Sequence, residues 1–444
     1  MPSKRKLEQP AITFPKPFLW GAAVASHSVE GGNFSNDWWA WEQRPGRIAH
    51  DASSKTASEH FERFKQDFEL AASFGHKAVL LNLEWSRIEP EQGAFNEAAL
   101  FHYDQVFETL TAQHLEPLCV LQQVTLPKWF ADAGGWCARE APERFAAYTA
   151  KVIERYGHFC RYWIPVCEPM RYVRRTHLEG LWPPGAQHPL HARTALKHIM
   201  EAHAAAYRFI HKNLREPRVG LSIRLRSVAP YDAGSSWDLR TARREILLSN
   251  EMLVRAELRN EWPRLLHRVS DFAGAADFLA CGYYGRERVR FNPFEGRNLC
   301  VEKVDVQGKP AKAHAMEAAP EDLGKLLCAA SAHGLPLMIT GNGISTTDDA
   351  VRCMYLLDHL EQVHRAMANG AEILGYFHRS LLDGFEWLRG YDASYGLFHV
   401  DRHTLTRTPN PSAYLYKEIC ETGAVRAGVA ERFCPAWKER SHSA

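Results

Sequence analysis

The sequence lacks the long apolar runs that mark membrane and secreted proteins. No apolar segment is long enough to span a bilayer, and no apolar region follows the basic N-terminal residues MPSKRKLEQP. We therefore expect no membrane partner, no secretory signal and a cytoplasmic location. The ten cysteines form no CxxC pair and no framework of even spacing, which indicates reduced thiols, most of them small core residues.

The chain also lacks an excess of one charge. Its 54 Lys and Arg residues and its 52 Asp and Glu residues are interspersed and give a net charge of +2, without the basic stripe of a nucleic-acid binder. It has no Gly-rich strand-to-helix fingerprint for a phosphate or dinucleotide, and its His and Cys residues show no metal-ligand spacing. We therefore expect no nucleic-acid partner, no cofactor and no metal, while the oligomeric state stays open.

What the chain does contain is an alternation of short apolar runs and longer amphipathic stretches. Helical periodicity predicts helices over Ser58–Phe74, Pro142–Tyr156, His198–Leu214 and Asp348–Ala368. Continuous apolar runs are typical of strands buried on both faces of a parallel sheet. Eight such runs are present: Phe18–Ala25, Ala78–Leu83, Pro117–Val124, Tyr162–Cys167, Val219–Leu225, Asp277–Tyr284, Pro336–Thr340 and Ile373–Leu382.

Eight strands with intervening helices predict an α/β fold, a single (β/α)8 TIM barrel with long βα loops. We place the barrel at residues 13–425, with a flexible N-terminal leader over 1–12 and a C-terminal tail over 426–444. The longest loops are expected over Glu30–Lys55 and Arg286–Pro320, because both hold Pro, Gly and polar residues.

Function in such a barrel collects at the C-terminal ends of the strands. The residues there are polar and aromatic, although the runs that precede them are apolar. Aromatic faces stack on sugar C–H surfaces, while carboxylates and amides bind hydroxyls, so the set predicts a pocket for a small-molecule glycoside or sugar derivative. Its members are Ser28, Gln123, Cys167, Glu168, Tyr284, Gly341, Arg379, Glu386 and Trp387.

Several long motifs, in order over nearly the whole chain, resemble glycoside hydrolase family 1, the retaining β-glycosidases. FPKPFLWGAAVASHSVEG is similar to the opening strand, LEWSRIEPEQGAFNEAALFHYDQ to the second strand and helix, and TLPKWFADAGGW to the loop after the third strand. WIPVCEP corresponds to the motif ending in NEP, ITGNGI to ITENG, and SLLDGFEWLRGYDASYGLFHVD to the family's C-terminal motif.

The resemblance implies a mechanism with two carboxylates about 5–5.5 Å apart, a nucleophile and an acid/base. Glu168 stands at the acid/base position. Gly341 stands at the nucleophile position, and glycine has no side chain with which to attack. Tyr284 matches the tyrosine that contacts the nucleophile, and Glu386 and Trp387 match the pair that binds the sugar's outer hydroxyls.

Other positions change together with the nucleophile. The family's arginine beside it is Leu80 here, which is consistent, since a buried arginine without its carboxylate would destabilise the fold by roughly 3–5 kcal/mol. Five further positions that contact the sugar in the family also differ in this chain. They are Ser28, Gln123, Cys167, Gly282 and Arg379.

Two main hypotheses follow. The first is a glycosidase of altered mechanism, with Glu168 as general acid/base. Its second group would be a more distant carboxylate, for which Glu84 and Asp383 are candidates by position, or the thiol of Cys167. Transfer or elimination, with Glu168 and Tyr284 as acid and base, is a further variant that the sequence does not select.

The second hypothesis is a catalytically inactive protein that binds a carbohydrate in the pocket at the C-terminal ends of the strands. Arg379 bears on the kind of ligand, because a guanidinium fork suits a carboxylate, phosphate or sulfate. Arg379 could equally form a salt bridge with an acid of the pocket.

Overall fold

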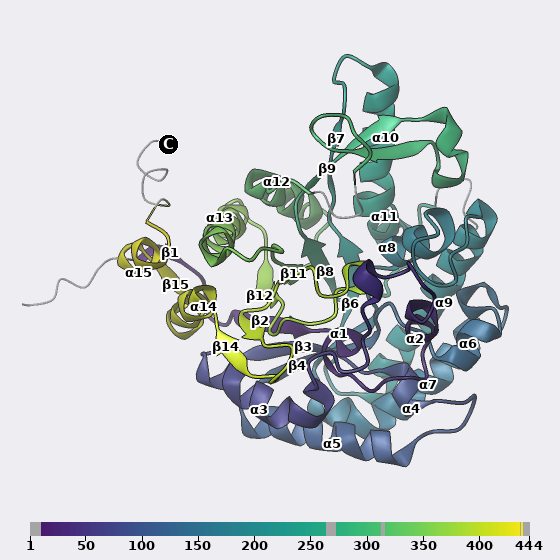
Figure 1. The fold of residues 1–444 in the computed structure, drawn as a ribbon, viewed down its shortest axis with the longest axis horizontal. Coiled ribbons are helices and arrows are strands. Elements are labelled where there is room, and N and C mark those ends of the chain that lie inside the picture. The colour runs from purple at the N-terminus through teal and green to yellow at the C-terminus, as the bar shows by residue number, and fades with distance from the viewer. Residues whose placement is uncertain (1–9, 263–271, 312–315, 436, 438–444) are drawn as a thin grey trace, which may run out of the picture.

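The computed structural model describes residues 10–262, 272–311, 316–435 and 437. Its centre is a closed barrel of eight parallel strands (Figure 1). This confirms the predicted (β/α)8 barrel, and each of the eight apolar runs overlaps one strand. The strands, in their order around the barrel, are β2 (Leu19–Val24), β3 (Ala78–Asn82), β4 (Glu116–Gln122), β5 (Tyr162–Val166), β6 (Arg218–Arg224), β8 (Phe278–Tyr283), β11 (Leu337–Asn342) and β12 (Ile373–Arg379).

The strands are apolar throughout because both of their faces are buried. Alternate side chains of a strand point to opposite faces, so Ala78 and Leu80 of β3 point into the barrel, while Val79 and Leu81 pack against the outer helices. The inward side chains form a separate core cluster below the pocket. Its members are Ala78, Leu80, Leu118, Val120, Ile164, Phe278, Ala280, Met338 and Phe377.

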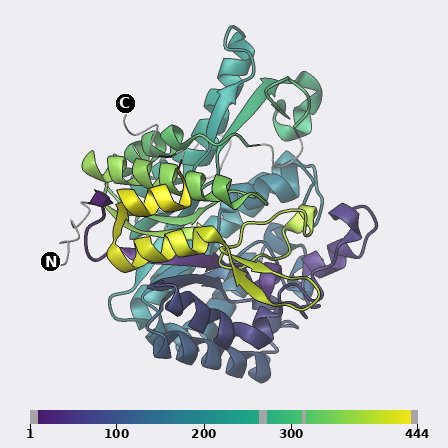
Figure 2. The same cartoon turned by 60° about the vertical axis from the view of Figure 1, so that its left-hand side comes forward.

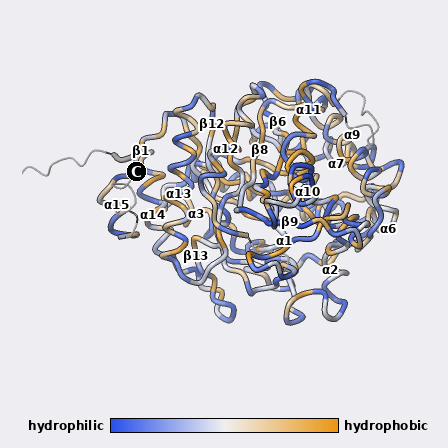
Figure 3. The backbone as a smooth tube through the Cα atoms, turned by 90° about the horizontal axis from the view of Figure 1, so that it is seen from above, coloured by the Kyte–Doolittle hydropathy of each residue, from blue (hydrophilic) through white to orange (hydrophobic). Residues whose placement is uncertain are grey.

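Helices cover the outside of the barrel, and hydrophilic and hydrophobic residues alternate along them (Figure 3), as expected when one face of a helix packs on a sheet. The four predicted helices are present; one begins at Pro189 rather than at His198, because His188 caps it. The longer outer helices are α3 (His60–Ser73), α5 (Glu97–Ala112), α7 (Ala141–Tyr156), α9 (Pro189–Asn213), α12 (Pro320–Ser331), α13 (Asp349–Ala368) and α14 (Pro411–Thr422).

The segment Arg286–Pro320 is not one long loop. It contains β9 (Arg286–Phe291), the 3-10 helix η6 (Pro293–Asn298) and β10 (Val301–Val304). The strands β9 and β10 form a small sheet with β7 (Ser227–Pro230). Together with α10 (Ser236–Ile246), a π-helix η5 (Leu247–Glu251) and α11 (Met252–Arg259), this sheet makes an insertion. The insertion projects from one side of the barrel (Figures 1 and 2). Its charged, half-exposed strands explain why their sequence resembles a loop.

The short elements lie mostly at the mouth of the barrel. The predicted loop Glu30–Lys55 contains two of them, α2 and η1. The full set of short elements is α1 (Ser26–Val29), α2 (Asp37–Glu42), η1 (Ala49–Asp51), α4 (Trp85–Ile88), α6 (Lys128–Asp132), η2 (Gly135–Cys137), η3 (Gly157–Phe159), α8 (Pro169–Val173), the π-helix η4 (Arg174–Leu178), η7 (Trp387–Arg389), β13 (Phe398–Val400) and β14 (Arg407–Pro409).

The two ends of the described chain pair with each other. Strand β1 (Pro10–Thr13) runs antiparallel to β15 (Ala424–Arg426), and α15 (Ala427–Phe433) follows. The last residues of the predicted leader and the first of the predicted tail therefore have regular structure, and the rest of the leader lies outside the described residues. In the described parts of the chain, no helix has the length and apolar character needed to cross a membrane.

Candidate functional site

A pocket of about 840 Å³ opens at the C-terminal ends of the barrel strands. All nine site residues predicted from the sequence line it, together with Leu80 and Gly282. They come from seven different strand ends or loops, which is why they are scattered along the chain. The nine are Ser28, Gln123, Cys167, Glu168, Tyr284, Gly341, Arg379, Glu386 and Trp387.

The space beside Gly341 is filled by a tyrosine. A Cβ atom built on Gly341 would lie 2.6 Å from the hydroxyl oxygen of Tyr284, which is far closer than atoms that are not bonded can approach. Leu80, which the resemblance places beside this position, is buried in the apolar barrel core. The pocket wall beside Gly341 is therefore formed by the Tyr284 hydroxyl and the apolar side chain of Leu80.

Glu168 occupies space that a second glycine leaves open. A Cβ atom on Gly282 would lie 2.5 Å from Glu168 Oε1, so this position of the carboxylate requires glycine at 282. The backbone N–H of Glu168 donates to Ser222 Oγ at 3.0 Å. Gly282 and Gly341 thus fit the present positions of Glu168 and Tyr284.

Three arginines surround Glu168. The carboxylate forms an ion pair of 2.8 Å with Arg171, which follows it by one turn at the start of α8. Burial alone would raise the pKa of Glu168, but the positive charges of the three guanidinium groups outweigh it and hold the pKa below its ordinary value of 4.5. The three are Arg171, Arg224 and Arg379. Glu168 is therefore ionised at neutral pH and carries no proton to donate to a leaving group.

Arg379 pairs with Glu386 through Nη2 and Oε2. The salt bridge considered from the sequence is thus present, and Glu386 is not left with both oxygens available for sugar hydroxyls. The Arg379 guanidinium also lies over the ring of Tyr395, 4.7 Å from its centre, and 5.6 Å from that of Tyr284. Trp387 stacks on His27 at the pocket wall, with ring centres 5.4 Å apart.

Neither candidate for a second carboxylate lines the pocket. Both oxygens of Glu84 accept from Thr125, and one also accepts from Ser86, at 2.8 to 3.1 Å. Asp383 accepts from the backbone N–H of Gly396 at 2.9 Å, away from the pocket. Among the described residues, Glu168 and Glu386 are the acids of the pocket wall.

The thiol of Cys167 is not activated. Burial, and next the negative charge of Glu168, raise its pKa to about 12, so that it stays protonated at neutral pH and is a weak nucleophile. Its place beside Ser222 in the pocket wall suits a small packing residue.

Two polar atoms of the pocket wall remain available for a ligand. The oxygens Ser28 Oγ and Gln123 Oε1 are buried and have no hydrogen-bond partner within the described part of the chain. The described residues contain no group of three or more His, Cys, Asp or Glu side chains that could hold a metal ion.

Sequence reasoning missed Arg171 and Arg224. Arg171 carried a signal, because a basic residue three positions after Glu168 can pair with it on one helix face. Arg224 is the last residue of β6, and a charge at the end of an apolar run in a barrel points to the site.

We predict that the Glu168 carboxyl titrates below pH 4.5 in the native protein. Arg171→Met should raise its pKa, because burial disfavours the ionised carboxylate and one of the positive charges that offset this effect is removed. Carbon-13 NMR of glutamate-labelled protein would follow the titration, with Glu168→Gln identifying the signal. Arg288→Met, which removes an arginine paired with Glu317 outside the pocket, is the matched control. A carboxyl titrating near pH 6 or 7 in the native protein would contradict this electrostatic reading.

Taken together, the closed barrel and the pocket of acids and aromatic residues at its C-terminal end define a glycosidase-like (β/α)8 protein. The chain belongs to Glycosyl hydrolase family 1, whose sequence model matches residues 11–424. It is similar to β-glucosidase A of Thermotoga maritima, with 27% identity over 443 residues that cover 93% of this chain and 98% of that protein.

Two solved structures are also similar. The β-glycosidase from Pyrococcus horikoshii superposes with a TM-score of 0.87 at 31% identity, covering 96% of this chain and 98% of that one. The β-glucosidase from Thermotoga maritima in complex with glucoimidazole has a TM-score of 0.86 at 27% identity, with coverages of 93% and 99%.

Proposed function

We propose that this protein binds an anionic, glycoside-like ligand in the barrel pocket and leaves the glycosidic bond intact. The observation that carries the proposal is the Tyr284 hydroxyl, which stands 2.6 Å from where the first side-chain atom of a nucleophile at position 341 would be. The double-displacement route of the family needs an attacking carboxylate at that point. The Tyr284 hydroxyl would have to move to admit one, and Leu80 cannot pair with it as an arginine would.

Hydrolysis by an altered mechanism has weaker support. Such a route needs Glu168 as a general acid, yet three arginines keep its carboxyl ionised. It also needs a second carboxylate that activates water, and Glu386, the other acid of the pocket wall, is paired with Arg379. A binding role needs neither group to move a proton.

Two features support a sugar-like ligand. Trp387 keeps an aromatic ring at the pocket wall, and the two oxygens Ser28 Oγ and Gln123 Oε1 are available to hydroxyl groups. The similar structure from Thermotoga maritima holds glucoimidazole, which supports a sugar-shaped ligand for this chain as well.

The charge balance supports a ligand with a negative group. Arg171 and Arg379 pair with Glu168 and Glu386 in the pocket wall, and the positive charge of the neighbouring Arg224 acts on the same site. Guanidinium groups bind carboxylate, phosphate and sulfate through paired hydrogen bonds.

We predict that the pure protein does not hydrolyse aryl β-glucosides or aryl β-galactosides, because no group can form the glycosyl ester. A thermal-shift screen of neutral sugars, uronates and sulfated sugars is expected to show stabilisation by members that carry a negative charge. Product analysis of each stabilising ligand should return it unchanged. Steady turnover that disappears in Glu168→Gln would refute the proposal, and so would a screen in which no sugar stabilises the protein.

A further inference from the structure

A second cavity, of about 460 Å³, lies beside the barrel pocket, where the insertion meets the barrel. We call it the side pocket. Its wall is formed mainly by basic side chains from α8 and η4, from β6 and the residues that follow it, and from β10. These are Arg171, Arg174, Arg175, Arg224, Arg226 and Lys303.

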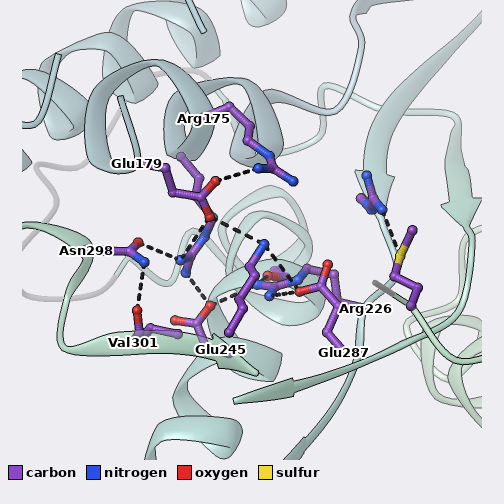
Figure 4. A network of polar contacts seen from close by, with 12 residues as sticks. Arg175, Glu179, Arg226, Glu245, Glu287, Asn298 and Val301 are labelled. Carbon is purple, nitrogen blue, oxygen red and sulfur yellow. Dashed lines mark hydrogen bonds and ion pairs between the residues drawn. The ribbon is translucent and has the colours of Figure 1, made fainter. Parts of the chain in front are cut away.

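Carboxylates offset part of this charge (Figure 4). One oxygen of Glu245 accepts from both Arg174 and Arg226, the latter at 2.8 Å. Glu287 lies 2.5 Å from Arg226 and 3.5 Å from Lys303.

Glu179 lies 2.9 Å from Arg175 and 3.4 Å from Lys303. Glu168 pairs with Arg171 from the side of the barrel pocket. With Glu245 and Glu287, this makes four carboxylates for the six basic groups within the described part of the chain, an excess of two positive charges there, one of them that of Arg224.

Arg224 is the basic residue of this set that has no carboxylate partner within the described chain. Its guanidinium lies over the ring of Tyr284, 4.7 Å from the centre, and contacts Met316 Sδ at 3.4 Å. Burial lowers its pKa, as does the nearby charge of Arg171, while the charges of Glu168 and Glu287 raise it. Neither carboxylate forms an ion pair with Arg224 within the described chain, so its guanidinium can still pair with an anion.

We propose that the side pocket binds a tetrahedral oxyanion, the phosphate or sulfate group of a ligand, against Arg224 and the basic residues around it. Basic groups converge there from a helix, from β6 and from β10. A planar carboxylate is satisfied by one guanidinium fork, whereas a tetrahedral anion presents oxygens in several directions at once. The anion would supply the negative charge that the four carboxylates leave missing.

The side pocket is close enough to the barrel pocket to serve one ligand. Arg171 lines both cavities. Arg171 and Arg224 also line a third cavity of about 360 Å³, together with Arg379 and Glu386 of the barrel pocket. If the proposed function holds, the ligand is a sugar whose phosphate or sulfate group reaches into the side pocket; the anion site itself does not depend on that function.

The test uses the full chain and inorganic phosphate and sulfate, with chloride at equal ionic strength as the reference. We expect phosphate or sulfate, but not chloride, to raise the melting temperature, and calorimetry to give a saturable isotherm. Arg224→Met should weaken that binding about tenfold or more, since one charge-assisted hydrogen bond is lost. The variant should fold, because no carboxylate loses its partner.

Arg288→Met is the matched control, since it removes one positive charge from the same insertion without lining the side pocket. If both variants weaken anion binding equally, the effect comes from the net charge of the protein and the proposed site is overturned. It is also overturned if phosphate and sulfate act no differently from chloride.

A sulfated disaccharide gives the other arm of the experiment. Tighter binding than inorganic sulfate, lost in Arg224→Met, assigns the anion to a sugar ligand, and equal binding assigns it to a small inorganic ion; both results support the side pocket. The uronates of the earlier screen carry no phosphate or sulfate group, and the aryl glycosides test hydrolysis alone, so failure of the proposed function is read from these compounds separately.

Discussion

Gly341→Glu is expected to lower the free energy of unfolding by about 3–5 kcal/mol, because it buries a carboxylate that displaces the Tyr284 hydroxyl and has no arginine at position 80 to pair with. The new Cβ atom meets the Tyr284 hydroxyl at 2.6 Å, so the tyrosine must move. The resemblance places an arginine at position 80 to balance such a carboxylate, and this chain has Leu80 there, inside the apolar barrel core. We expect no gain of β-glucosidase activity, since Glu168 remains ionised beside Arg171.

A double-mutant cycle with Leu80→Arg separates the causes. Each single charge is buried without a partner, so each variant alone should be destabilised in urea unfolding, while the pair should recover about 1–3 kcal/mol through coupling of neighbours. Gly341→Ala, which adds only the methyl group, measures the steric part. If Gly341→Glu is as stable as the native protein, or hydrolyses aryl glucosides, the interpretation of the filled nucleophile position is wrong.

The barrel could be predicted from the sequence because its signal is local. A strand buried on both faces is an apolar run, and each of the eight runs overlaps a barrel strand. The insertion could not be predicted in this way: β9 reads RERVRF, and arginines at alternate positions of a half-exposed strand resemble a polar loop. Its pairing with β7, which lies before β8 in the chain, is a long-range contact without a sequence signal.

The positions of the site residues could be predicted, but not their partners. Motif order placed Glu168, Tyr284 and Gly341 at the C-terminal ends of barrel strands, and they line one pocket. The ion pair with Arg171 depends on how α8 starts after Glu168, which itself has a left-handed φ of 43°. The side pocket joins residues of α8, β6 and β10 through the insertion, so that its charge balance becomes visible only in three dimensions.

Glu245→Gln is expected to cost roughly 3 kcal/mol at pH 7. Burial alone would raise the pKa of Glu245, but Arg174 and Arg226 outweigh it and lower the pKa from 4.5 to about 2. A tenfold change in proton affinity corresponds to about 1.4 kcal/mol, so this difference corresponds to roughly 3 kcal/mol of stability. Because the folded-state pKa is the lower one, the contribution is complete above pH 4.5 and is lost as the pH falls towards 2.

The measurement is urea unfolding of the native protein and the variant between pH 7 and pH 3. The gap between them should be widest at pH 7 and should narrow below pH 4.5; a gap that does not change with pH would mean that the glutamine merely packs badly. Glu302→Gln is the control, since Glu302 pairs with the half-exposed Arg290 in the same insertion, and such pairs contribute about 0–1 kcal/mol. Loss of Glu245 also leaves the side pocket with one more positive charge, so phosphate should stabilise this variant more strongly than it stabilises the native protein.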